Sequence, residues 1–178
     1  MIQPIIAATT RRATIADAVA LAAIGRQTFF DTFKDTCTES DMTGFLESYF
    51  SLAQVTKELR NDEEYFYIAE HNGVLVGYAR FMEDYSCFSL MKQWKALELK
   101  RLYVSQAFHG QGVAQELMEV VLNFATGGQY QVVWLGVWEH NLRAQRFYEK
   151  AGFTYSGHTH DFPIGDTPQT DRWYWKFL

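Results

Sequence analysis

The chain has 178 residues, a formal net charge of −5 at pH 7, and hydrophobic and charged contents of 48% and 21%. This length and composition predict a single globular domain over residues 1–178, and the acidic balance argues against a nucleic-acid partner. Cys37 and Cys87 lack metal-ligand spacing, so we expect two free thiols in a cytoplasmic protein that has no metal site.

The N-terminal part of the chain predicts a short strand followed by helices. The strand is expected over residues 5–12. Thr14 then has the side chain of an N-cap, and Asp17, three residues later, completes a capping box for a helix over residues 15–33. The apolar stretch 16–24 is interrupted by Asp17 and is shorter than the roughly 20 residues that span a bilayer, which argues against a membrane partner. Two further helices are predicted, over residues 39–50 and 51–61.

A β-hairpin is predicted next. Tyr65–Glu70 and Val74–Glu83 are rich in strand-forming residues and flank Asn72-Gly73, a pair typical of a two-residue hairpin turn. Beyond the hairpin, strands and helices alternate, and Asn141 and Gly152 are residue types typical of a helix start and a helix end. The elements expected there are a strand at 96–104, a helix at 111–125, a strand at 132–138, a helix from Asn141 through Ala151, and strands at 153–160 and 172–178.

A glycine-rich loop lies between the strand at 96–104 and the helix that follows it. Gly110 and Gly112 allow a tight bend, and a helix that starts there presents unpaired backbone N–H groups at the positive end of its dipole. Such a site suits phosphate groups. A P-loop would need Gly-Lys-Ser/Thr where Val113-Ala114 stands, and a dinucleotide fingerprint would need a glycine at Gln115. A turn that merely connects strand and helix is the remaining alternative.

Two segments together resemble the GNAT family of acetyl-CoA-dependent N-acetyltransferases. The first is His109-Gly-Gln-Gly-Val-Ala114, which departs from the family pattern at His109, where Arg or Gln is usual. The second is the segment Asn141–Phe153, which matches the family's later helix. Its matching positions are Asn141, Ala144, Phe147, Tyr148, Lys150, Gly152 and Phe153.

The resemblance implies an α/β (α+β) fold with a mixed, mostly antiparallel sheet flanked by helices. It also implies a V-shaped splay between the strands at 96–104 and 132–138, in which the pantetheine arm of acetyl-CoA would lie against Leu102, Tyr103 and Val104. The diphosphate would sit on the N–H groups of Gly110, Gln111, Gly112, Val113 and Ala114. Further cofactor contacts are expected from His109, Asn141, Ala144, Tyr148 and Lys150.

Two residues are candidates for the proton transfers of acetyl transfer to an amine. Tyr148 matches the family tyrosine that approaches the cofactor sulfur, and a phenol can donate to a developing thiolate. The alternative is that Tyr148 is a core aromatic; since adjacent residues cannot share one helix face, we expect Phe147 to be the core residue. Glu98 is the candidate base, and its alternative is an ordinary strand carboxylate paired with Lys100 or Arg101.

Three segments, Gln27–Phe33, Trp134–Glu139 and Gln169–Asp171, carry a narrower resemblance that extends over most of the chain. They resemble the PaiA-type members of the family, which are associated with polyamine acetylation. This resemblance predicts a small polyamine as the acceptor; an amino acid, an aminoglycoside-like amine, a protein N-terminus, or a non-catalytic acyl-CoA-binding role are the alternatives. Edge strands near the C-terminus make a homodimer plausible. Trp134 and Trp138 are interpreted as core residues. The candidate acceptor-binding residues are Phe33 and the carboxylates Asp31, Asp35, Glu83 and Asp84.

Overall fold

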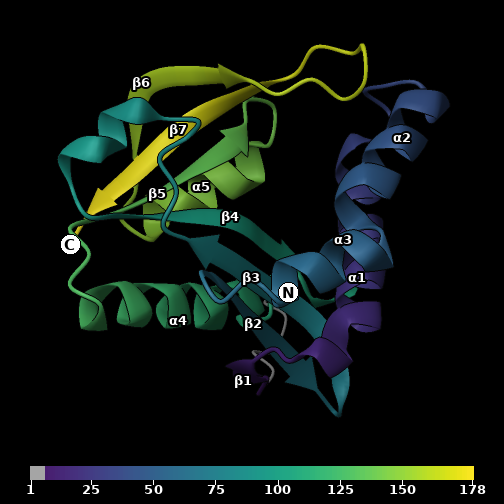
Figure 1. The fold of residues 1–178 in the computed structure, drawn as a ribbon, viewed down its shortest axis with the longest axis horizontal. Coiled ribbons are helices and arrows are strands. Elements are labelled where there is room, and N and C mark those ends of the chain that lie inside the picture. Colours follow the sequence, from purple (N-terminus) through teal and green to yellow (C-terminus); the bar gives the residue numbers. More distant parts are fainter. Residues whose placement is uncertain (1–6) are drawn as a thin grey trace.

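The computed structural model describes residues 7–178, which form one seven-stranded sheet with helices on both faces (Figure 1). The strand order is β1-β2-β3-β4-β5-β7-β6, and every pairing is antiparallel except that of β4 with β5. This confirms the predicted mixed, mostly antiparallel sheet. The strands are β1 (Thr9–Arg12), β2 (Glu64–His71), β3 (Val74–Met82), β4 (Ala96–Val104), β5 (Val132–Trp138), β6 (Thr154–Asp161) and β7 (Thr170–Phe177). The helices are α1 (Ala18–Phe33), α2 (Glu39–Phe50), α3 (Leu52–Leu59), α4 (Val113–Gly127) and α5 (Leu142–Lys150).

Local sequence signals set most of the element boundaries. The Thr14 amide donates to Asp17 Oδ2 at 2.7 Å, so the predicted capping box is present, and a 3₁₀ turn over Ile15–Asp17 leads into α1. The β2–β3 hairpin turns at Asn72 and Gly73, whose φ angles of 52° and 75° are those of the predicted turn. Of the strand predicted over residues 5–12, residues 5 and 6 lie outside the described residues. Two further 3₁₀ turns were not predicted, at Ser89–Gln93 and Gln106–Phe108.

The two central strands separate after a short parallel contact. β4 pairs with β5 only over Ala96–Glu98. On the other side of β4, the β3 residue Arg80 pairs with Arg101 while Phe81 pairs with Leu99, which leaves Lys100 as the extra residue of a β-bulge. A bulge bends its strand and increases the local twist. The bulge therefore accounts for the splay that the family resemblance implied.

Each face of the sheet has its own apolar layer. One face packs against α4 and α5 in a cluster that includes Leu97, Leu135 and Tyr148. The other face is covered by α1, α2 and α3 and, near β5 and β7, by the aromatic segment that contains Phe88 and Met91 (Figure 1). Because β4 and β5 diverge, the space between them can be reached from both layers. No helix among residues 7–178 has the length and apolar character needed to cross a membrane.

The β6–β7 connection closes one end of this space. It extends across to α2, where Thr167 Oγ1 donates to Asp41 Oδ2 at 3.0 Å (Figure 1). Phe162 in the same connection packs on the α1 residues Phe29 and Phe33. The first helices and the last strands, which are far apart in the sequence, therefore build one wall together.

Candidate active site

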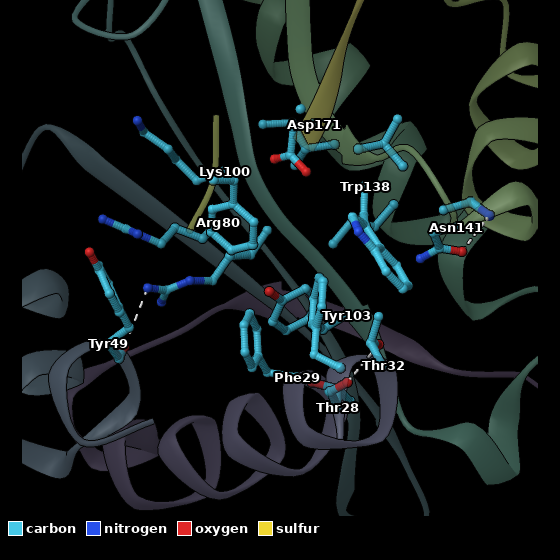
Figure 2. Close-up of a pocket in the computed structure, with 18 of the residues that line it drawn as sticks. Thr28, Phe29, Thr32, Tyr49, Arg80, Lys100, Tyr103, Trp138, Asn141 and Asp171 are labelled. Carbon is cyan, nitrogen blue, oxygen red and sulfur yellow. Dashed lines mark hydrogen bonds between the residues drawn. The ribbon is translucent and has the colours of Figure 1, made fainter. Parts of the chain in front are cut away.

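A cavity of about 790 Å³ occupies the splay between β4 and β5 (Figure 2). Its lining comes from α1, α2, the strands β3 to β7 and α5. That volume is within the range of small-molecule sites. Eleven residues that sequence reasoning selected line it: Asp31, Phe33, Asp84, Glu98, Leu102, Tyr103, Val104, His109, Asn141, Ala144 and Tyr148.

The loop that follows β4 presents unused backbone donors. Gly112 adopts a left-handed conformation with φ 93° and caps α4, which begins two residues later than predicted. The first helical bond runs from the Glu116 amide to the Gly112 carbonyl at 3.1 Å. Within residues 7–178, the amides of Gly112, Val113 and Ala114 donate to no protein acceptor. Such a set of converging donors at a helix N-terminus fits a diphosphate group.

His109 connects this loop to α5. Its Nε2 lies 2.8 Å from the Val104 carbonyl oxygen, and its Nδ1 contacts the Arg143 guanidinium. Burial lowers the pKa of His109, the hydrogen bond to Val104 opposes this effect, and the Arg143 charge adds to it. The imidazole is therefore neutral, with Nε2–H donating to Val104 and Nδ1 accepting from Arg143. Where the family usually has a charged or amide side chain, this chain has an imidazole that holds a cation beside the loop.

Tyr148 is placed in the cavity by a short capped helix. The Asn141 side chain accepts a hydrogen bond from the Ala144 amide at 3.1 Å and so starts α5. Tyr148 is buried in the cluster under α4 and also lines the cavity. Phe147, which was expected to be the core residue of the two, is only half-buried and packs against the same cluster. Burial raises the pKa of the Tyr148 hydroxyl, and the nearby charge of Asp171 raises it further. The phenol therefore keeps its proton at neutral pH.

Glu98 lies where β4 and β5 part and is itself buried. Its Oε2 is 2.7 Å from Lys100 Nζ, which also lies 2.6 Å from Asp84 Oδ2. Burial raises the pKa of Glu98 to about 7, although the Lys100 charge opposes this effect. Of the two cations that the sequence offered as partners, Lys100 is the one that pairs with Glu98, because Arg101 pairs instead with Glu58 at 2.8 Å.

Several predicted residues lie outside the cavity lining. Glu83 is exposed, and its carboxylate accepts from the Tyr85 hydroxyl at 2.9 Å, while its neighbour Asp84 lines the cavity. Successive residues of an extended chain point to opposite sides, so only one of these two carboxylates can face inward. Of these two candidate carboxylates, Asp84 therefore lines the cavity and Glu83 does not. The others outside the lining are Asp35, the exposed Lys150, and the loop residues Gly110, Gln111, Gly112, Val113 and Ala114.

Trp138 and Asp171 are among the lining residues that the sequence reasoning did not select, as are Phe29, Arg80 and His160. Trp134 is fully buried, as predicted, whereas Trp138 is half-buried: it packs against the core cluster of Phe29 and Phe33 and also lines the cavity. Asp171 also lines the cavity, beside Trp138 in the sheet register (Figure 2). The alternation of β7 could have indicated it, because Asp171 shares a strand face with Trp173 and Trp175, and a carboxylate on an otherwise aromatic face is unusual.

Comparisons with known proteins agree with this geometry. Residues 26–153 match the acetyltransferase (GNAT) family. An N-acetyltransferase of Lactobacillus delbrueckii subsp. lactis is 33% identical over 150 residues, which cover 84% of this chain and 85% of that protein. One from Mycobacterium tuberculosis is 33% identical over 155 residues, covering 87% and 94%.

Among solved structures, the PaiA N-acetyltransferase of Thermoplasma acidophilum in complex with coenzyme A superimposes with a TM-score of 0.78 at 18% identity. The superposition covers 97% of this chain and all of that one. That protein shares the fold described above. The assignment of this chain to a family rests on the family match and on the two relatives that are 33% identical. The chain belongs to the GNAT family of acetyltransferases and is an N-acetyltransferase of that type.

Proposed function

We propose that this enzyme transfers an acetyl group from acetyl-CoA directly to a primary amine of a small polyamine such as spermidine. The class of the acceptor is inferred from the charge balance of the cavity. The guanidinium of Arg80 and the ammonium of Lys100 are already paired with protein carboxylates, and so is Arg101. Arg143 also lines the cavity without a carboxylate partner among the described residues, but it lies against His109 beside the loop proposed for the diphosphate. Asp171 has no cation partner among the described residues, so the uncompensated charge of the cavity near β7 is negative. A cationic acceptor complements it.

Acetyl-CoA supplies the acetyl group as an activated thioester. The unused amides of Gly112, Val113 and Ala114 would hold its diphosphate, with Arg143 beside them on His109. Support for direct transfer comes from the one cysteine that lines the cavity. Cys87 has Ser86 as its hydrogen-bond partner, and no imidazole among residues 7–178 is bonded to it as an activating base would be.

The proton balance of the reaction defines the roles that the enzyme has to provide. An acceptor ammonium loses two protons on becoming an amide; one ends on the coenzyme sulfur and the other is released to solvent. We assign the donation to sulfur to Tyr148, whose hydroxyl is protonated at neutral pH. Glu98 is proposed as a base that removes a proton from the nitrogen, since its pKa of about 7 leaves a sizeable basic fraction at that pH.

Replacing Glu98 with Gln tests its role as a base. If Glu98 takes a proton during turnover, kcat/KM at pH 7 should fall by ~10² or more, because general bases contribute ~10²–10⁴-fold. Coenzyme affinity, measured by calorimetry, should stay close to that of the wild type. A loss of less than about tenfold would show that Glu98 serves only as the partner of Lys100.

A panel of amines tests the acceptor class. The purified enzyme is offered acetyl-CoA with spermidine, spermine, amino acids, an aminoglycoside and a peptide with a free N-terminus, and the released coenzyme thiol is measured. We expect the highest kcat/KM with spermidine or spermine. Efficient use of another amine without turnover of these two would overturn the polyamine assignment. Tight acetyl-CoA binding without turnover of any amine would instead indicate an acyl-CoA-binding regulator.

A further inference from the structure

We propose that Asp171 binds the acceptor as its ammonium ion and takes the first of its two protons. This inference rests on the proposed transfer to an amine and deepens it, because it names the residue that recognises the reacting nitrogen. Each of two carboxylates then takes one proton from the nitrogen: Asp171 takes the first and leaves a neutral amine, and Glu98 takes the second, which leaves later.

The sheet register places Asp171 in a row of three side chains that face the cavity. Asp171 in β7 is paired with Trp138 in β5 and with His160 in β6. Directly paired residues of antiparallel strands point to the same face, and all three line the cavity. Gly136 makes room for the carboxylate over β5, because a Cβ atom there would lie 2.9 Å from Asp171 Oδ2.

Asp171 and Tyr148 reach the splay from opposite layers of the molecule. Asp171 lies on the strand face of Trp173, which belongs to the aromatic cluster around Phe88, whereas Tyr148 belongs to the layer under α4. The two groups are nonetheless close enough for the Asp171 charge to raise the pKa of Tyr148. A nitrogen held by Asp171 therefore lies on the far side of the splay from the residue assigned to the coenzyme sulfur.

Glu98 and Asp171 differ in what neutralises their charge. Glu98 is held by Lys100, so it has a cation before any substrate arrives. For Asp171, burial is the only influence that acts on its pKa, and it raises that pKa to about 7. The titratable groups that face Asp171 are Tyr148 from α5, Tyr103 from β4 and His160 from β6. None of these is a permanent cation, so an ammonium ion from the acceptor would be the first strong partner of Asp171.

The neighbours of Asp171 in the row also have unused polar atoms. Trp138 Nε1 and His160 Nδ1 are buried and have no hydrogen-bond partner in the part of the chain that the structure describes. Buried polar groups are nearly always paired in folded proteins, and an unpaired one in a cavity calls for an explanation. Trp134 Nε1, outside the cavity lining, is unpaired in the same way, so these atoms describe the polar surroundings of Asp171 and are not counted as ligand contacts.

The proposed reaction consists of two proton losses from the nitrogen and one transfer of the acetyl group. An N–H bond of the ammonium breaks and an O–H bond forms on Asp171, and the electron pair stays on nitrogen. The neutral amine then forms its bond to the acetyl carbon as the carbon–sulfur bond breaks. Tyr148 gives its proton to the sulfur and is reprotonated with the second nitrogen proton, by way of Glu98. Asp171 releases the first proton to solvent, so the net reaction yields amide, thiol and one proton.

The experiment compares Asp171→Asn with the wild type from pH 6 to pH 9.5, using the best amine of the panel. Asp161→Asn is the matched control, because Asp161 is an exposed carboxylate of β6 that does not line this cavity. We expect Asp171→Asn to lower kcat/KM at pH 7 by ~10²–10⁴-fold with unchanged affinity for CoA. The deficit should shrink as the pH rises, because more of the amine (pKa about 10) then arrives without the extra proton. Asp161→Asn should behave as the wild type.

A second readout does not depend on activity. A carboxyl group whose pKa is raised on folding stabilises the fold at low pH, and this contribution is lost as the pH rises through the folded-state value of about 7. Asp171→Asn should therefore have a higher melting temperature than the wild type at pH 8 and a similar one at pH 4. His160→Gln should keep the wild-type pH dependence of stability if Asp171 is the group that titrates.

Three results would overturn the proposal. They are a loss of less than tenfold for Asp171→Asn, a deficit that stays constant from pH 7 to pH 9.5, and a variant that is less stable than the wild type at pH 8. If the preferred amine is not a polyamine, only the acceptor assignment fails, and the comparison is made with the preferred amine. If the wild type turns over no amine at all, both proposals fail.

Discussion

Tyr148→Phe should lower kcat by ~10²–10⁴-fold while changing the affinity for CoA by no more than about twofold. The substitution removes one oxygen and keeps the ring, which packs against Phe147 and Phe153 and helps to close the cavity. A hydroxyl that donates only as the thiolate departs contributes to the transition state and little to coenzyme binding. Steady-state kinetics with spermidine and calorimetric titration with CoA measure the two effects separately.

Tyr155→Phe is the matched control for this change. Tyr155 is exposed on β6 and is absent from the cavity lining, so losing its hydroxyl should leave kcat unchanged. Equal losses of kcat and of CoA affinity in Tyr148→Phe would mean that the hydroxyl serves packing or binding. An unchanged kcat would point to another donor, for which Tyr103 is a candidate because it also lines the cavity and burial raises the pKa of its hydroxyl.

The parts of the fold that could be predicted are those specified by neighbouring residues. The Thr14–Asp17 capping box, the Asn72-Gly73 turn and the Asn141 cap all depend on contacts within a few residues of each other. The same holds for the apolar runs that became β4 and β5, whose predicted bounds agree with the structure. The splay itself followed from the family resemblance; its local cause, the bulge at Lys100, is visible only in the pairing of β3 with β4.

The acceptor end of the cavity could not be predicted in the same way, because strand register determines it. Asp171 faces inward because β7 pairs with β5 so that Trp138 stands opposite it, and a register shifted by one residue would turn it away. Trp138 and Trp134 have the same periodicity in the sequence, yet only Trp134 lies where Phe88 and Trp173 cover it. Sequence periodicity gives the face of a strand but does not show what covers that face.

A buried ion network lies under the cavity. Glu58 of α3 binds Arg101 of β4 through 2.8 Å and 3.1 Å hydrogen bonds and lies 3.4 Å from Arg80 of β3. Glu58 and Arg101 are only 4% and 8% exposed. Glu58→Ala would therefore leave Arg101 buried without its carboxylate. Removing one partner of such a pair costs ~3–5 kcal/mol, so the free energy of unfolding in urea should fall by that amount.

The matched control is Glu63→Ala, at an exposed position, which should change the free energy of unfolding by less than about 0.5 kcal/mol. Combining Glu58→Leu with Arg101→Met should recover most of the lost stability, because it removes both buried charges together. A loss below about 1 kcal/mol in Glu58→Ala would show that water reaches Arg101.

The same network connects stability to acceptor choice. Arg80 and Arg101 both line the cavity, and Glu58 cancels positive charge that they would otherwise present to the acceptor. In a Glu58→Ala enzyme that is still folded at low temperature, KM for spermidine should therefore rise more than KM for a monoamine. Equal increases for both amines would mean that the ion network only holds α3 against the sheet. A selective increase would show that a carboxylate lying beneath the arginines sets the charge that the acceptor meets.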